Sequence, residues 1–216
     1  MYNNFGGEDF RYNRNQKYIT IDFETENLNL YERNRPWQVA AVFSTGFKID
    51  KVESKYVMWP DLNVGKGAAI ATGFDFNKVA AMGEDPKSTL EWLDGYIYDP
   101  SYKVLWFNGL NFDIYIHNIW RKELGLNVDF SYVSRSIDVN TLVKARKLGV
   151  KMKPNDDILE FQYRFTNFHQ RGFKTNLTQC CKDFNIPMDE SKFHDATYDT
   201  EQTFRVFEAV VKAMDI

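Results

Sequence analysis

The chain has 216 residues, of which 44% are hydrophobic and 16% aromatic, so it is long enough to bury one substantial core. A net charge of −3 and a pI near 5.7 argue against a protein that coats a nucleic-acid duplex through a broad basic face. The sequence has no secretory signal and no apolar run that could span a bilayer, and its two adjacent cysteines cannot form a CxxC metal site. We therefore expect a cytoplasmic protein without a membrane partner.

After a flexible leader, expected over residues 1–17, alternating apolar residues predict three sequential strands that suggest an antiparallel meander. Two further strands follow, and the first of them, at 102–107, is so apolar that it should be buried on both faces. The five expected strands cover residues 18–23, 37–44, 52–59, 102–107 and 134–139. The expected helices cover residues 86–96, 112–123, 177–184 and 196–214, and a further helix follows the strand at 134–139 and runs through residue 146.

This order of elements predicts an α/β fold with a mixed sheet, in which parallel strands join the antiparallel three-strand meander and helices cover both faces. The segment 149–174 is longer than an ordinary connection and rich in aromatic and basic residues, so it is a candidate inserted lobe. We otherwise expect one domain over residues 18–216.

Asp22 and Glu24 lie two residues apart on the first expected strand, so both side chains project from one face while Ile21 and Phe23 point the other way. Neighbouring carboxylates at the end of an apolar strand repel each other, and a bound cation would compensate that cost. A solvated edge strand would explain the same pair, since Asp-x-Glu is common by chance.

Asp199 lies near the start of the last expected helix, where helical spacing places Thr203, Val206 and Val210 beneath it on the buried stripe. A carboxylate in that position points at the sheet, although the same acid could simply favour the positive end of the helix dipole. His194 lies in the loop before this helix, from which an imidazole could reach a metal-bound water. A surface histidine is the alternative.

Asp113 follows the buried strand at the junction NGLNFD, where a loop leads into a helix. Functional residues collect at such strand ends in open α/β sheets. The alternative is an ordinary acid at a helix N-terminus, with Asn108 and Asn111 forming turns around Gly109. Considered singly, each acid therefore has a structural explanation as well as a functional one.

Three segments in this order resemble the motifs of the DEDDh branch of the DnaQ-like 3′-5′ exonuclease superfamily, which has an RNase H-like fold. IDFET at 21–25 is similar to the first motif, WFNGLNFDIYI at 106–116 to the second, and HDATYDTEQT at 194–203 to the third. Two positions depart from the family pattern, because Phe107 stands where a histidine is common and Gln38 where a glutamate is usual.

The resemblance implies a metal-dependent 3′-5′ exonuclease, expected to act on single-stranded DNA and to release 5′-mononucleotides by a two-metal mechanism. It implies two divalent ions, Mg²⁺ or Mn²⁺, a nucleic acid with a free 3′ end, and a polymerase or replication protein as a candidate partner in trans. The implied metal ligands are Asp22, Glu24, Asp113 and Asp199, which with the general base His194 form the catalytic set. The implied substrate contacts are Phe23, Thr25, Gln38, Asn108 and Phe112.

Alternatives remain open at this level. The same residues would serve a 3′-5′ exoribonuclease of the RNase T or oligoribonuclease kind, because discrimination requires a 2′-hydroxyl contact that the sequence does not show. The chain could also be a catalytically silent relative that binds nucleic acid, and the stretch 163–174 could bind single strands by stacking. SIDVNTL at 136–142 resembles the family's Asp-Thr pair at the start of a helix, in which Asp138 is expected to be structural. The sequence does not indicate an oligomeric state.

Overall fold

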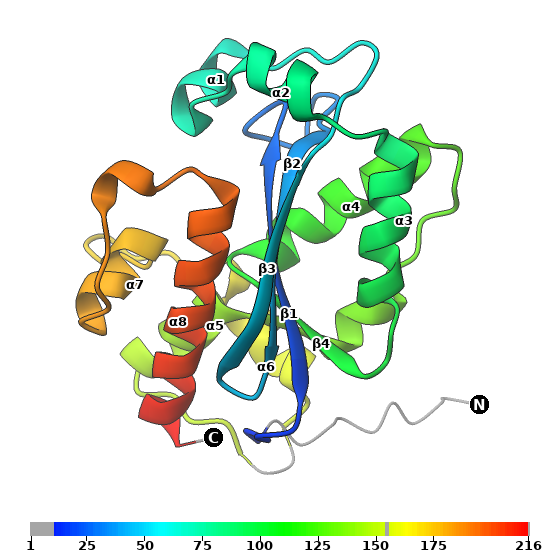
Figure 1. The fold of residues 1–216 in the computed structure, drawn as a ribbon. Coiled ribbons are helices and arrows are strands. Elements are labelled where there is room, and N and C mark those ends of the chain that lie inside the picture. Colours follow the sequence, from blue (N-terminus) through cyan, green and yellow to red (C-terminus); the bar gives the residue numbers. More distant parts are fainter. Residues whose placement is uncertain (1–10, 154–155, 216) are drawn as a thin grey trace.

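The computed structural model describes residues 11–153 and 156–215, so the expected leader over residues 1–17 lies mostly outside the described residues (Figure 1). Within the described chain, five strands form one sheet in the order β3-β2-β1-β4-β5. They are β1 (Lys17–Thr25), β2 (Pro36–Thr45), β3 (Lys48–Tyr56), β4 (Tyr102–Trp106) and β5 (Ser136–Asp138). β1 and β3 pair antiparallel with β2, whereas β4 pairs parallel with β1 and β5. The predicted mixed sheet with its three-strand meander is confirmed.

Helices cover both faces of this sheet, as predicted (Figure 1). One face carries α3 (Pro86–Ile97) and α4 (Asp113–Glu123). The other carries α5 (Val139–Lys147), α6 (Ile158–Thr166), α7 (Leu177–Asp183) and α8 (Ala196–Met214). The core is accordingly divided into two clusters, one on each face of the sheet. None of the described helices is long and apolar enough to cross a membrane.

β1 lies in the middle of the sheet, and its side chains point alternately to the two faces, which decides where its acids point. The Phe23 side chain belongs to the core cluster under α3 and α4, where it packs against two tryptophan rings. The Tyr18 side chain belongs to the cluster on the other face, and its ring lies 5.1 Å from that of Phe207 on α8. Because alternate residues of a strand share a face, Asp22 and Glu24 point toward the layer that contains α8.

Two short helices, α1 (Lys66–Thr72) and α2 (Phe76–Met82), do not follow from the sequence pattern. They cover the end of the sheet at which β1 finishes (Figure 1). Each buries a single residue, Ala68 in α1 and Val79 in α2, so neither shows the apolar stripe that predicts an amphipathic helix. α2 begins instead at a capping residue, Asp75, whose side chain accepts two backbone N–H groups of its first turn.

The segment 149–174 contains α6, which returns to the core. Phe161 and Phe165 of α6 are buried in the cluster on the α8 side of the sheet. The Gln162 side chain accepts the backbone N–H of Asp138, so α6 is joined to the point at which β5 ends and α5 begins. The division into a single domain with an inserted lobe at this segment stays a prediction.

Asp138, the N-cap of α5, holds the loop between β4 and α4. Its carboxylate accepts the backbone N–H of Asn108 at 3.1 Å and that of Leu110 at 3.3 Å, besides the N–H of Asn140 in its own cap. These three bonds agree with the structural role expected for this acid. They also fix the loop that leads into Asp113.

The same loop requires a glycine at position 109, because a Cβ there would lie 2.3 Å from the Cβ of Trp106. We expect Gly109→Ala to lower the free energy of unfolding by about 1–3 kcal/mol, since the backbone must move to relieve the overlap. Gly95→Ala in α3 is the matched control, because its Cβ would meet no atom within 4 Å. That change should stabilise the protein by about 0.5–1 kcal/mol. Urea unfolding of both variants measures the two effects, and equal stabilities would contradict a close contact between position 109 and Trp106.

Candidate metal centre

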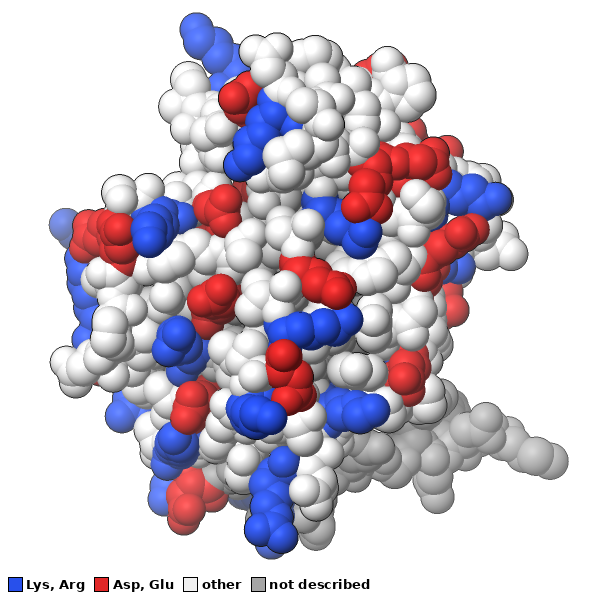
Figure 2. Space-filling model, in the orientation of Figure 1, with Lys and Arg blue, Asp and Glu red and all other residues white. Residues whose placement is uncertain are grey.

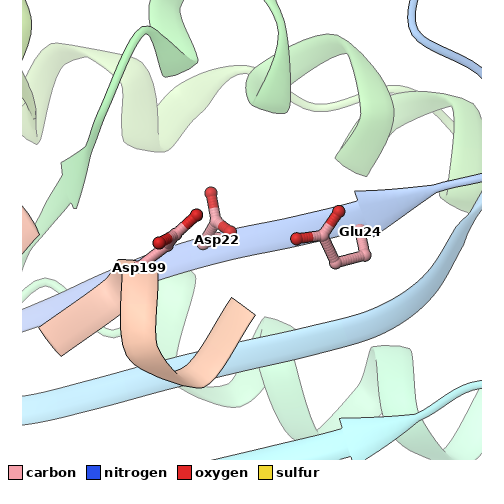
Figure 3. Close-up of side chains that lie close together, drawn as sticks. All are labelled: Asp22, Glu24 and Asp199. Carbon is pink, nitrogen blue, oxygen red and sulfur yellow. The ribbon is translucent and has the colours of Figure 1, made fainter. Parts of the chain in front are cut away.

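Three carboxylates that are far apart in the sequence meet at the end of β1. Asp22 and Glu24 project from the same side of the strand, and Asp199 reaches them from the first turn of α8 (Figure 3). Each offers one oxygen atom, and these oxygens lie within 4.8 Å of one another. The structure thus brings the acids of the first and third predicted motifs into one cluster.

Asp113, the first residue of α4, is buried beside this cluster but lies outside the group of three. Its charge contributes to the raised pKa of Asp22, so the two carboxylates are close enough to repel each other. Burial, followed by the charge of Asp138, raises the pKa of Asp113 to about 8. The acid of the second predicted motif therefore lies next to the cluster of three. We call Asp22, Glu24, Asp113 and Asp199 together the acidic corner.

Burial and mutual repulsion oppose the ionisation of the clustered acids. Burial raises the pKa of Glu24 to about 9, and the charges of Asp199 and Asp195 add to this effect. The pKa of Asp22 is raised well above its ordinary value, first by burial and then by the charge of Glu24. Burial also raises the pKa of Asp199 to about 6, although the backbone N–H of His194 opposes that shift. Positive charge placed among these groups would relieve the repulsion.

The donor set fits a divalent cation that prefers oxygen ligands. Oδ1 of Asp199 is buried and has no hydrogen-bond partner among the described residues. A buried carboxylate oxygen without a partner is costly unless a ligand occupies the space in front of it. Clustered carboxylates are typical of Mg²⁺ and Mn²⁺ sites. Asp22, Glu24 and Asp199 could therefore hold such an ion, with Asp113 at the border of the site.

His194 lies beside the cluster on the loop that leads into α8. Its backbone is in the left-handed region, with φ of 70°, and its N–H donates to Oδ2 of Asp199 at 3.1 Å. His194 is exposed and lines a cleft of about 530 Å³ between the end of α1 and this loop. The structure therefore places the predicted base next to the acidic corner, on the wall of the cleft.

The five predicted substrate contacts lie in different environments. Gln38 stands opposite an acid of the cluster in the β1–β2 register and lines a pocket of about 80 Å³ that adjoins the cleft. Thr25 is buried at the end of β1, while Asn108 is exposed and Phe112 half-buried on the loop before α4. The Phe23 ring, by contrast, packs in the core on the opposite face of β1 and does not reach the acidic side.

Some residues at the site do not follow from the sequence. Asp195 caps α8, and its charge adds to the raised pKa values of Asp22 and Glu24. The sequence could mark Asp195 as a helix cap, but only the structure shows that its charge acts on the acids of β1. α1 and α2 contribute Thr72 and Lys78 to the walls of the cleft and pocket, and no motif indicated them.

No family model and no curated protein matches the sequence. Solved structures of exonuclease I match the fold. The complex of the Escherichia coli enzyme with single-stranded DNA, in its zinc-ion-bound form, has a TM-score of 0.72 and 18% identity, covering 93% of this chain and 41% of that chain. A product-bound exonuclease I has a TM-score of 0.68 and 19% identity, covering 90% and 43%. The E. coli enzyme with a dA16 oligonucleotide has a TM-score of 0.66 and 20% identity, covering 89% and 42%.

The chain thus spans about two fifths of the length of the structures it matches. The predicted resemblance is therefore confirmed for the fold, which is the RNase H-like arrangement of a mixed sheet with helices on both faces.

The raised pKa values predict how stability depends on pH when no metal is bound. Between about pH 4, where free carboxyls titrate, and the raised values of Glu24 and Asp113, which reach about 9 and 8, the folded protein binds more protons than the unfolded chain. Stability therefore falls as pH rises through this window. We expect the melting temperature in chelator to fall from pH 5 to pH 9, and added Mg²⁺ or Mn²⁺ to raise it most at the alkaline end.

Asp22→Asn tests the origin of this effect, because it removes one of the repelling charges. In chelator near pH 8 the variant should melt at a higher temperature than the wild type. Added metal should raise the melting temperature of the variant much less than that of the wild type. Glu91→Gln is the control, since that acid lies exposed on α3 and should not alter the pH dependence. A metal-free stability that increases over the same pH window would contradict the assignment.

Proposed function

We propose that this protein is a metal-dependent 3′-5′ exonuclease of the DEDDh kind that hydrolyses single-stranded DNA. The observation that carries the proposal is the meeting of Asp22, Glu24 and Asp199, whose ligand oxygens lie within 4.8 Å of one another. Asp113 borders the cluster and His194 lies at its mouth, so all five residues of the predicted catalytic set gather at one corner of the fold. The fold shared with exonuclease I supports the same reaction.

In this proposal Asp22, Glu24 and Asp199 hold divalent cations, with Asp113 as the remaining ligand. Bound Mg²⁺ or Mn²⁺ would stabilise the charge that develops on the attacking and leaving oxygens of the phosphodiester. The buried Oδ1 of Asp199, which has no described partner, is the best-supported single ligand atom. Four carboxylates together match the charge of two divalent ions, which would let a polyanionic substrate approach the corner.

His194 is the group suited to accept a proton from the attacking water. Its loop is tied to the cluster because the backbone N–H is bonded to Asp199, while the residue itself remains exposed in the cleft. A base has to lie within hydrogen-bond reach of the nucleophile, and this position provides both proximity and access. Asp199 would then have two roles, since it holds metal through one oxygen and the base's loop through the other.

The cleft between α1 and the loop before α8 is the proposed entrance for a 3′ end. Its volume of about 530 Å³ is in the range of small-ligand sites. Single-stranded DNA is favoured as substrate because exonuclease I structures of the same fold contain single-stranded DNA and an oligonucleotide. An exoribonuclease remains the second candidate, and a polymerase or replication partner in trans remains a prediction.

The proposal is tested by incubating the protein with 5′-labelled single-stranded DNA and RNA, in Mg²⁺ or Mn²⁺ and in chelator. We expect stepwise shortening from the 3′ end that requires metal and is faster on DNA. Asp22→Ala should abolish shortening, because the acidic corner loses one of its proposed metal ligands. His194→Ala should reduce kcat by about 10²–10⁴-fold, the usual contribution of a general base.

Glu91→Gln is the control, because that acid is exposed on α3, on the face of the sheet opposite to the clustered acids, and should leave the rate unchanged. If wild-type protein leaves DNA and RNA intact with both metals, the enzymatic proposal is wrong. If Asp22→Ala digests as fast as the wild type, the enzyme acts through another site.

A further inference from the structure

Three exposed aromatic side chains form a surface beside the loop that carries Asp113. We call it the aromatic platform. It comprises Tyr115 of α4, Phe130 of the connection between α4 and β5, and Tyr163 of α6, which are 42%, 41% and 48% exposed. The rings of Tyr115 and Phe130 are 6.0 Å apart. Tyr163 lies in the last turn of α6, whose end is joined to the loop before α4 by a hydrogen bond from the Asn111 side chain to the carbonyl of Thr166. Exposed aromatic rings that gather in this way are typical of a binding surface.

Hydrogen bonds connect this platform to the candidate catalytic corner. The Asn111 side chain donates to the carbonyl of Thr166 at 3.3 Å and to Oδ1 of Asn167 at 3.4 Å. Asn167 follows Tyr163 by one helical turn, and Asn111 precedes Asp113 by two residues. The end of α6 is therefore joined directly to the loop that positions an acid of the site.

The stretch of sequence that contains Tyr163 differs in charge from the rest of the chain, although Lys144 within it is buried and Lys147 and Lys182 pair with Asp183 and Glu190 outside it. The basic segment, residues 139–182, contains nine of the 27 lysines and arginines but only three of the 30 aspartates and glutamates. Arg171 and Lys174 are exposed there, and no described carboxylate forms an ion pair with either. Arg164 is exposed beside Tyr163 and lies 3.6 Å from Asp156. By contrast, the face seen in Figure 2 mixes both signs of charge.

We propose that the aromatic platform and the basic segment bind the part of a single strand that lies upstream of the 3′ end being cleaved. This inference rests on the proposed function and adds the path of the strand to it. Stacking on aromatic rings, combined with phosphate contacts from nearby cations, is how proteins hold single strands without reading their sequence. The excess of positive charge in the basic segment favours a polyanion over a protein partner.

The orientation of α4 determines which nucleotides reach the platform. Asp113 lies on the buried side of this helix, whereas Tyr115, two residues further on, is rotated by about 200° and faces outward. A terminal nucleotide at the acids therefore cannot also lie on the platform. Only substrates several nucleotides long can occupy both, so affinity depends on strand length.

Binding is measured in chelator, so that no cleavage occurs, by fluorescence anisotropy of labelled oligodeoxythymidylates. We expect Tyr163→Ala and Phe130→Ala each to weaken binding of a strand of about 20 nucleotides roughly tenfold, the effect of losing one stacked base. Tyr163→Phe, which keeps the ring, should bind like the wild type. In Mg²⁺, hydrolysis of a trinucleotide by these variants should remain within about twofold of wild type, because so short a strand does not reach the platform.

Charge is tested separately through the salt dependence of the same Kd. Arg171→Ala and Lys174→Ala should each make the dependence of log Kd on log salt less steep, since each removes a phosphate contact. Lys48→Ala is the matched control, because this exposed lysine lies at the start of β3, and it should change nothing.

Unchanged binding of the long strand by Tyr163→Ala, with melting temperature and circular dichroism like those of the wild type, would overturn the inference. So would an equal loss of trinucleotide hydrolysis, because the residue would then act at the acids. If wild-type protein shortens DNA while every platform variant binds normally, only this inference fails. If wild-type protein cleaves nothing, the proposed function fails, and the binding data in chelator still decide whether the platform holds single strands.

Discussion

The repulsion among the carboxylates that meet at the end of β1 is the constraint on which the rest of the structure depends. Burial disfavours the charged form of each acid, and each neighbour adds to that penalty. The packed elements nevertheless hold the groups together, because the core on the opposite face fixes the orientation of β1 and α8 is anchored by its own buried stripe. Asp199 gains some compensation from its place in the first turn of α8, where the helix dipole favours negative charge.

Asp138 and the candidate ligand Asp199 differ in how their carboxylate oxygens are satisfied. Asp138 is as deeply buried as any acid in the described chain, and burial raises its pKa to about 6, yet three backbone N–H groups bond its carboxylate. Asp199 has one described backbone donor and one buried oxygen without a partner. Burial alone therefore does not identify a ligand, and Asp199 differs from Asp138 in having an unsatisfied buried oxygen within a cluster of carboxylates.

The features that the sequence predicted are those that depend on local periodicity. Alternation along β1 placed Asp22 and Glu24 on one face, and the helical repeat placed Asp199 above a stripe whose members Thr203 and Val206 are buried. The features that it missed depend on contacts between distant segments. α1 and α2 are too short and too exposed to show a repeat, and only the folded chain shows that the charge of Asp195 acts on Asp22.

The two edges of the sheet also limit how copies of this protein can meet. The outer strand β3 carries alternating charges at Lys51, Glu53 and Lys55, which discourage another strand from pairing along it. At the opposite edge β5 has three residues, and the side chain of Gln162 is bonded to its backbone. Fibre-like growth by strand addition is therefore disfavoured at both ends, and an assembly of this protein would have to form through its helices and loops.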